Sequence, residues 1–147
     1  MGDLPGSVLF CCTLNALRSP MAEGILKMIH GKQIFVDSVG IRAGELDGFA
    51  VSVMDEIGVD ISRHRPKAFD YLEDTSFDLI ISMSPEAHHR ALEMTRTMAC
   101  DVEFWNTFDP SLIEGSRDVR LDAYREVRDQ LMRRIRQRFP AGLVPAF

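Results

Sequence analysis

The sequence has too few cysteines for a disulfide framework and no apolar run long enough for a membrane span. Its three cysteines, Cys11, Cys12 and Cys100, are odd in number and two of them are neighbours, unlike the paired cysteines of small secreted domains. We therefore expect a reducing, cytoplasmic location. No apolar run approaches the ~20 residues that cross a bilayer, so the sequence predicts no membrane partner.

The chain also lacks the charge and the motifs of several ligand-binding classes. Its net charge of −5 is opposite in sign to the basic footprint of nucleic-acid binding, so we expect no nucleic-acid partner. Neither a GxxxxGK[ST] run nor a GxGxxG run occurs, so nucleotide binding has no support. The four histidines do not occur with other metal-ligating residues at the spacing of a metal site. We expect no metal ion and no cofactor.

What the sequence does contain is an alternation of short apolar runs with segments of helical spacing. A chain of 147 residues, 46% of them apolar, suits one domain over residues 1–147, with residues 1–6 as a short disordered lead. Strands are predicted over Ser7–Cys12, Gln33–Ser38, Phe77–Met83 and Cys100–Phe104, helices from about Pro20 to Gly31, Phe49 to Gly58, Pro85 to about Arg96 and from Arg117 onward, and a loop over Trp105–Gly115. The alternation predicts an α/β fold whose parallel sheet is covered by helices on both faces.

The run from Cys12 to Arg18 is the most informative stretch of the chain. Cys12 ends a predicted buried strand, and Ser19-Pro20 opens a predicted helix, so the loop between them can direct backbone N–H groups at an oxyanion. Such amides and a nearby cation favour a thiolate, which is the nucleophilic form of cysteine. Arg18 can bind two phosphate oxygens with its planar fork, and the Ser19 hydroxyl can donate a hydrogen bond to the sulfur. Asn15 tolerates the left-handed backbone that a tight loop needs.

Two further residues bear on this chemistry. A phosphomonoester needs an acid for its leaving oxygen and a base for water, and one carboxyl group can serve as both. Asp109 is the candidate because Pro110 stiffens its loop, and that loop follows a predicted strand at the same edge of the sheet. Cys11 is one residue out of phase with Cys12, so its side chain is predicted to enter the core on the opposite face.

These motifs resemble those of the low-molecular-weight protein tyrosine phosphatase family. The resemblance covers nearly the whole chain in the family's order. It rests on Val8–Glu23 (VLFCCTLNALRSPMAE), Ser38-Val39-Gly40, Gly58–Ser62 with His64-Arg65, Phe77–Met83 and Asp109-Pro110. It implies a single-domain, three-layer α/β/α fold with a four-stranded parallel sheet, of the phosphotyrosine protein phosphatase I-like type. It also implies a phosphate-binding loop of Thr13, Leu14, Asn15, Ala16, Leu17, Arg18 and Ser19, with Cys12 as nucleophile, Arg18 as clamp and Asp109 as acid.

Three positions depart from the family pattern. Leu14 stands where the family has a loop glycine, which would strain the loop if a positive φ or a very close approach were needed there. Leu17 stands where a second loop cysteine could protect an oxidised Cys12 as a disulfide. Ser111-Leu112 replaces the aromatic residues that wall the family's phosphotyrosine site. Phe49, Trp105 and Phe108 are the aromatic residues that could substitute, although core or loop packing is the simpler interpretation of each.

Three functions therefore compete. The first is hydrolysis of a phosphomonoester, either on a phosphorylated protein or a small molecule, through a phosphocysteine on Cys12. The second is a thiol-dependent arsenate reductase of the same fold, for which Cys100 is the sole cysteine distant from the loop, so that glutathione or a partner would have to complete the relay. The third is a non-catalytic domain that binds an anion or a partner, suggested by Leu14. The sequence leaves the oligomeric state open between a monomer and a weak dimer.

Overall fold

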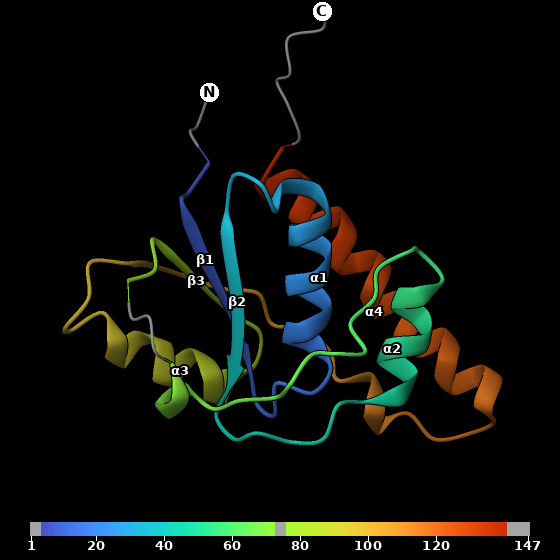
Figure 1. The fold of residues 1–147 in the computed structure, drawn as a ribbon. Helices are drawn as coiled ribbons and strands as arrows, with labels where there is room; N and C mark the ends of the chain where they lie inside the picture. The colour runs from blue at the N-terminus through green and yellow to red at the C-terminus, as the bar shows by residue number, and fades with distance from the viewer. Residues whose placement is uncertain (1–3, 73–75, 141–147) are drawn as a thin grey trace, which may run out of the picture.

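The computed structural model describes residues 4–72 and 76–140, which form one layered α/β arrangement (Figure 1). The strands are β1 (Ser7–Cys12), β2 (Phe35–Gly40), β3 (Leu79–Ser82) and β4 (Asp101–Phe104), and the helices are α1 (Arg18–His30), α2 (Gly48–Asp55), α3 (Pro85–Met94) and α4 (Arg117–Arg138), with short 3₁₀ helices η1 (Phe69–Tyr71) and η2 (Pro110–Leu112). The four strands lie in the order β2-β1-β3-β4, and every pair is parallel. The predicted four-stranded parallel sheet is thus confirmed.

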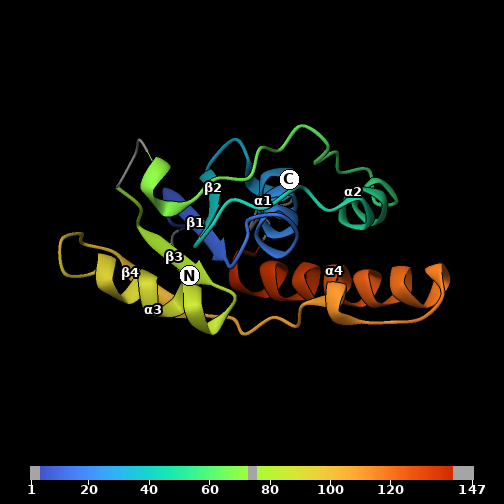
Figure 2. The ribbon, with the colours of Figure 1, turned by 90° about the horizontal axis from the view of Figure 1, so that it is seen from below.

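The sheet separates two hydrophobic clusters, and the alternation of side chains along β1 feeds both. Val8, Phe10 and Cys12 join the larger cluster, which includes residues of α1, α2 and α4. Leu9 and Cys11 join the smaller cluster with residues of α3. Figures 1 and 2 show the resulting layers, with α3 on one side of the sheet and the other three helices opposite. The prediction that the Cys11 side chain enters the core on the face opposite Cys12 is therefore confirmed.

The order of the strands changes direction at β1, and such a switch point is a common place for a ligand site. It moves from β1 to β2 on one side and then crosses to β3 on the other side of β1. In open parallel sheets, ligands bind at the carboxyl ends of the strands at such a switch point. The loops that follow β1, β2 and β4 all begin at this edge, although they are far apart in the sequence.

Strand β1 and the start of α4 agree with the predicted boundaries, whereas several other boundaries differ by one or more residues. Helix α1 begins at Arg18, so Pro20 lies in its first turn as predicted. Helix α2 ends at Asp55 and α3 ends at Met94, short of the predicted ends. The predicted loop after β4 contains the 3₁₀ helix η2, because the Asp109 carboxylate accepts the Ser111 amide and caps this turn. These shifts leave the fold class unchanged.

The chain before β1 is only partly as expected. Of the lead predicted to be disordered over residues 1–6, residues 1–3 lie outside the described residues. Leu4 packs against the larger cluster, and the Gly6 amide donates a hydrogen bond to Asp78 Oδ2 at 2.8 Å. Residues 4–6 are therefore held by contacts with the domain, a correction to the predicted lead. Within residues 4–72 and 76–140, no helix combines the length and the apolar character that a membrane crossing requires.

Candidate active site

A pocket of about 230 Å³ opens where β1 ends, at the edge of the sheet singled out above. The loop of residues 13–17 joins β1 to α1 and forms one side of it. The pocket is lined by Cys12, Thr13, Leu14, Ala16, Leu17, Arg18, Arg42, Glu45, Asp47, Asp109 and Ser111. The tertiary structure thus brings together the three residues predicted to be catalytic, although Asp109 lies more than 90 residues beyond Cys12 in the sequence.

The sulfur of Cys12 lies at the floor of this pocket and has two polar neighbours. The Asn15 backbone N–H donates to Cys12 Sγ at 3.3 Å, and Ser19 Oγ lies 2.8 Å from the same sulfur. Ser19 Oγ accepts a hydrogen bond from the Asn15 side-chain amide at 2.9 Å, so its own proton points either at the sulfur or at the Val39 carbonyl oxygen, which is farther away at 3.5 Å. The sulfur thus has one backbone N–H and one hydroxyl group within hydrogen-bond distance.

Asn15 connects the floor of the pocket to three other segments of the chain. Its φ of 53° confirms the predicted left-handed backbone, and it is the one non-glycine residue with positive φ in residues 4–72 and 76–140. Its side-chain amide donates to Ser19 Oγ and to Ser38 Oγ, each at 2.9 Å. Its side-chain oxygen, Oδ1, accepts a hydrogen bond from the Lys67 backbone N–H at 2.9 Å and lies 2.9 Å from His64 Nε2. Because the Lys67 amide can only donate, this bond fixes which end of the Asn15 amide is the oxygen.

Behind Asn15, a buried carboxylate continues the same network. Ser38 Oγ donates to Glu23 Oε1, and Lys27 Nζ pairs with Glu23 Oε2. His64 Nδ1 lies 3.8 Å from Glu23 Oε1. Burial lowers the pKa of His64, and the nearby carboxylate of Glu23 opposes that effect. Because Asn15 Oδ1 can only accept, His64 donates to it from Nε2, and Nδ1 faces Glu23. The sequence analysis missed this chain of contacts because its members are scattered over the sequence.

The segment after β2 holds the loop from outside by taking up its carbonyl groups. The backbone N–H groups of Ile41, Arg42, Gly44 and Asp47 donate to the carbonyls of Cys12, Thr13, Leu14 and Ala16 respectively, at 2.8–3.1 Å. With these carbonyls bonded outward, the loop amides remain for an anion on the pocket side, as the Asn15 amide shows by its bond to Cys12 Sγ. Backbone amides at the junction of a strand and a helix are a common binding site for oxyanions.

The glycine that this loop requires is Gly40, at the end of β2. A Cβ on Gly40 would lie 2.7 Å from the Asn15 nitrogen and 2.8 Å from the Leu14 carbonyl carbon, both of them backbone atoms that cannot yield. Leu14 itself does not have a positive φ, and its side chain extends outward at 44% exposure. The strain anticipated at Leu14 is absent, because the close approach and the left-handed turn fall on its neighbours.

Arg18 and Asp109 reach the pocket from two segments that contact each other. Arg18 Nη1 donates to the carbonyl oxygen of Thr107 at 2.9 Å, two residues before Asp109. Asp109 Oδ1 accepts both the backbone N–H of Ser111 at 3.0 Å and its hydroxyl at 2.7 Å. The guanidinium is thus anchored to the loop that carries the carboxylate, and Asp109 Oδ2 is the oxygen not engaged by these two bonds.

Four pocket residues were not predicted as site residues. Arg42, Glu45 and Asp47 come from the segment that follows β2, and Ser111 lies in η2. Asp47 also caps α2 and accepts the Tyr124 hydroxyl at 2.6 Å. Burial and this bond to Asp47 raise the pKa of Tyr124. The available signal was positional, since polar residues after a second strand of a parallel sheet share the edge of the first.

The three aromatic residues considered as substitutes for a phosphotyrosine wall do not line the pocket. Trp105 is buried, its ring tilted against that of Phe10 at 6.2 Å between centroids. Phe49 packs edge-on against Tyr124 at 5.4 Å. Phe108 is 52% exposed and faces a separate groove. Packing outside the pocket, the simpler interpretation of the sequence, is confirmed for Trp105 and Phe49, whereas Phe108 is exposed in the groove.

The two other cysteines are remote from the sulfur of Cys12. Cys11 is fully buried on the opposite face, and burial raises the pKa of its thiol well above the usual value. Cys100 precedes β4, level with the start of β1 in the strand register, so it lies roughly 16 Å along the strands from the level of Cys12 at about 3.3 Å per residue. A disulfide needs Cα atoms within about 7 Å. Cys100 is therefore too distant to bond Cys12, and its partial packing against the smaller cluster agrees with a structural role.

A comparison with families of known proteins matches residues 7–142 to the model of the low molecular weight phosphotyrosine protein phosphatases. The chain belongs to this family. Members of the family are cysteine-based phosphatases and arsenate reductases, which fits a pocket lined by a cysteine and an arginine.

The relatives of this chain include proteins named arsenate reductase and proteins named protein tyrosine phosphatase. The chain is 32% identical to an arsenate reductase of Bacillus subtilis over 88% of its own length and 92% of the relative's. It is 34% identical to an arsenate reductase of Bacillus licheniformis, with 89% and 93% covered. Among solved structures, the low molecular weight protein tyrosine phosphatase of T. tengcongensis superposes with a TM-score of 0.70 at 28% identity, covering 86% of this chain and 92% of that one. The fold and the family follow from these likenesses, and the reaction has to be argued from the site.

Proposed function

We propose that the protein hydrolyses phosphomonoesters through a phosphocysteine intermediate, and that its substrates are tyrosine-phosphorylated proteins. The observation that carries this proposal is the sulfur of Cys12, which receives hydrogen bonds at the floor of a pocket that Arg18 and Asp109 also line. Nucleophile, anion clamp and proton donor are the three parts that this chemistry needs.

In the first step, Cys12 Sγ attacks phosphorus and forms an S–P bond while the bond from phosphorus to the leaving oxygen breaks. Asp109 Oδ2 donates its proton to that oxygen. The Arg18 guanidinium and the amides of the loop bind the equatorial oxygens, whose charge they stabilise most strongly in the transition state. Ser19 stabilises the thiolate before the attack and again when the sulfur leaves.

In the second step, water attacks the phosphocysteine. Asp109 accepts the proton from the water, the S–P bond breaks, and inorganic phosphate leaves with the Cys12 thiolate restored. No electron is gained or lost in either step, so the reaction needs no reductant. A pocket with its nucleophile, cation and acid already in place can perform both steps with small side-chain movements.

Arsenate reduction is the second candidate, because curated relatives bear that name. Arsenate has the tetrahedral shape and the charge of phosphate, so the same loop amides and Arg18 would bind it. Reduction to arsenite needs two electrons, which a dithiol supplies when it becomes a disulfide. Cys11 and Cys100 are not placed to form that disulfide with Cys12, so an external thiol such as glutathione would have to complete it. The geometry therefore favours hydrolysis.

The deciding experiment runs both reactions on one preparation. We expect steady release of p-nitrophenol from p-nitrophenyl phosphate in the presence of a metal chelator, and a phosphorylated Cys12 peptide after rapid acid quench and mass spectrometry. We expect no arsenate-dependent oxidation of glutathione or of a thioredoxin system. Thiol oxidation without p-nitrophenol release would overturn the proposal in favour of the reductase. Binding of phosphate without either reaction would favour the non-catalytic alternative. A tyrosine-phosphorylated peptide then tests the finer assignment of the substrate.

A further inference from the structure

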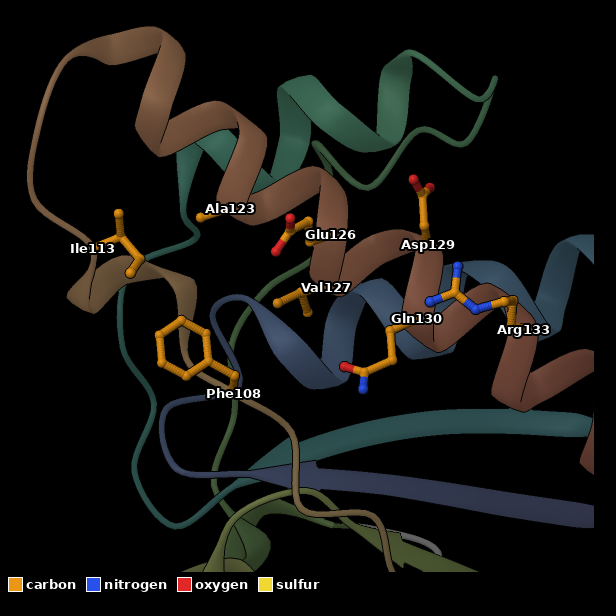
Figure 3. Close-up of a pocket in the computed structure, with 8 residues that line it drawn as sticks. All are labelled: Phe108, Ile113, Ala123, Glu126, Val127, Asp129, Gln130 and Arg133. Carbon is orange, nitrogen blue, oxygen red and sulfur yellow. The ribbon is translucent and has the colours of Figure 1, made fainter.

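A groove of about 470 Å³ lies between α4 and the loop of residues 108–113 (Figure 3). It is lined by Phe108, Ile113, Ala123, Glu126, Val127, Asp129, Gln130 and Arg133. Phe108 and Ile113 come from the loop of residues 108–113, and the other six come from α4 across from it. Its volume falls within the range of about 300–1,000 Å³ that ligand sites occupy.

The loop of residues 108–113 forms a wall shared by the two cavities. Asp109 and Ser111 line the pocket of Cys12, whereas Phe108 and Ile113 line the groove. The two spaces are thus separated by one short segment, and a chain that crosses the wall can enter both. A small phosphate ester held at Cys12 would fill the pocket and leave the groove untouched.

The loop side of the groove is apolar and accessible, whereas four of the six α4 residues across from it are polar or charged and form its rim, namely Glu126, Asp129, Gln130 and Arg133. Phe108 is 52% exposed and Leu112 is 70% exposed, and the buried Val127 side chain forms the apolar base of the groove on α4. Exposed aromatic and aliphatic side chains beside a pocket are typical of a contact surface for a macromolecule. Leu14 adds a further exposed apolar side chain on the pocket side.

We propose that this groove is a second contact site for polypeptide substrates, which takes an apolar side chain near the phosphorylated residue. The inference rests on the proposed function, since it assigns the class of substrate that the pocket of Cys12 receives. The occupant is a polypeptide, because an extended chain places successive side chains on opposite sides and can cross the wall with one side chain in each space. Phe108 is then a specificity-determining residue that contacts the substrate away from the reacting atoms.

The test measures binding in the Cys12→Ser background, so that turnover does not affect the result. Two tyrosine-phosphorylated peptides are compared that differ only in the two residues on each side of the phosphotyrosine, which are leucine in one and serine in the other. We expect the leucine peptide to bind about tenfold more tightly, since one well-buried aliphatic side chain accounts for an effect of this size. Fluorescence anisotropy of labelled peptides gives both dissociation constants.

Two further substitutions, each added to that background, locate the preference. Phe108→Ser removes the aromatic wall, and Ala123→Gln fills the groove from α4 without touching the loop; in both, the ratio of the two affinities is expected to fall towards one. Phe35→Ser is the matched control, because Phe35 is 53% exposed, close to the 52% of Phe108, and lies at the start of β2, at the end of the sheet away from the pocket. It is expected to keep the tenfold ratio.

The inference is overturned if the two peptides bind the background protein equally, if neither binds, or if the ratio survives either groove substitution. The proposed function fails by a different measurement, namely the absence of p-nitrophenyl phosphate hydrolysis by the unmodified protein. The two failures are thus read from separate experiments.

Discussion

At the floor of the pocket, Cys12, Asn15 and Ser19 are buried and joined by direct hydrogen bonds. At the rim, Leu14 and Ser111 are exposed and Asp109 is half-buried. The floor is held by hydrogen bonds to β2, to the segment that follows β2 and to the segment of residues 64–67, so that its geometry is set before any ligand arrives. The rim has fewer such restraints, and its side chains are the ones that a substrate beyond the phosphate group would meet. Under the proposed function, the floor sets the reaction and the rim selects the substrate.

The strongest test of the floor is the removal of its sulfur. Cys12→Ser is expected to lower kcat for p-nitrophenyl phosphate by at least about 10³-fold, because a serine hydroxyl at this position has no base to activate it. The matched controls are Cys11→Ala and Cys100→Ser, which change cysteines outside the pocket and should retain activity within about threefold. Full activity in Cys12→Ser would exclude the phosphocysteine.

The Asp109 carboxyl group is the one rim side chain to which we assign chemistry. Asp109→Asn is expected to lower kcat about 10²–10³-fold for an alkyl phosphate, whose leaving oxygen needs a proton. The loss should be smaller for p-nitrophenyl phosphate, because that leaving group departs as an anion. Steady-state kinetics with the two esters measure this. Equal losses with both would remove Asp109 from the role of general acid.

Asn15 tests whether the floor depends on its buried hydrogen bonds. Asn15→Ala leaves Ser19, Ser38 and the Lys67 amide without their partner and forces alanine into a left-handed backbone, so we expect about 2–4 kcal/mol less stability. Activity should fall with it, since Ser19 loses the bond that orients its proton. Urea unfolding and p-nitrophenyl phosphate kinetics give the two effects. Asn15→Gly is the control, because glycine adopts the left-handed backbone without strain and lacks only the side chain. If Asn15→Gly were as stable as the unmodified protein, the side chain would have no role in stability.

His64, at the outer end of the same network, adds a pH dependence to the stability. Burial lowers its pKa in the folded protein, below the value of about 6.5 in the unfolded chain. The unfolded state therefore binds the proton first, and the contribution of His64 is complete above about pH 6.5 and declines as the pH falls below it. The free energy of unfolding of the unmodified protein should exceed that of His64→Gln by less at pH 5.5 than at pH 7.5. A difference that grows at low pH would mean that Glu23 dominates instead.

Leu14 is expected to give the smallest effect, because the loop does not need glycine at this position. Leu14→Gly should change kcat/KM for p-nitrophenyl phosphate by less than about threefold and lower stability by about 0.5–1 kcal/mol through backbone entropy. Gly40→Ala is the contrasting variant, since its methyl group would collide with the backbone of the loop. A large gain of activity in Leu14→Gly would show that the leucine restricts the pocket.

The sequence was sufficient for the order of the elements, because strand and helix periods, proline at a helix start and glycine at a helix end are local signals. It was also sufficient for Cys12, Arg18 and Ser19, whose spacing lies within one strand–loop–helix unit. It could not locate the segment of Arg42–Asp47, or the role of Asn15 as a link to Ser38 and Lys67. Those partners are more than 20 residues away, and only the packed sheet decides which loops meet.

The requirement for glycine shows the same division. The resemblance to the family led to Leu14 as the position where a side chain would strain the loop. The fold transfers that requirement to Gly40, because the end of β2 passes directly against the loop backbone. Composition and motif by themselves determined a parallel sheet in which a strand ends on Cys12 and a short loop leads into a helix. The tertiary structure alone decided which side chains support that loop, which line its rim, and that a groove lies beyond Asp109, since these are contacts between segments distant in the sequence.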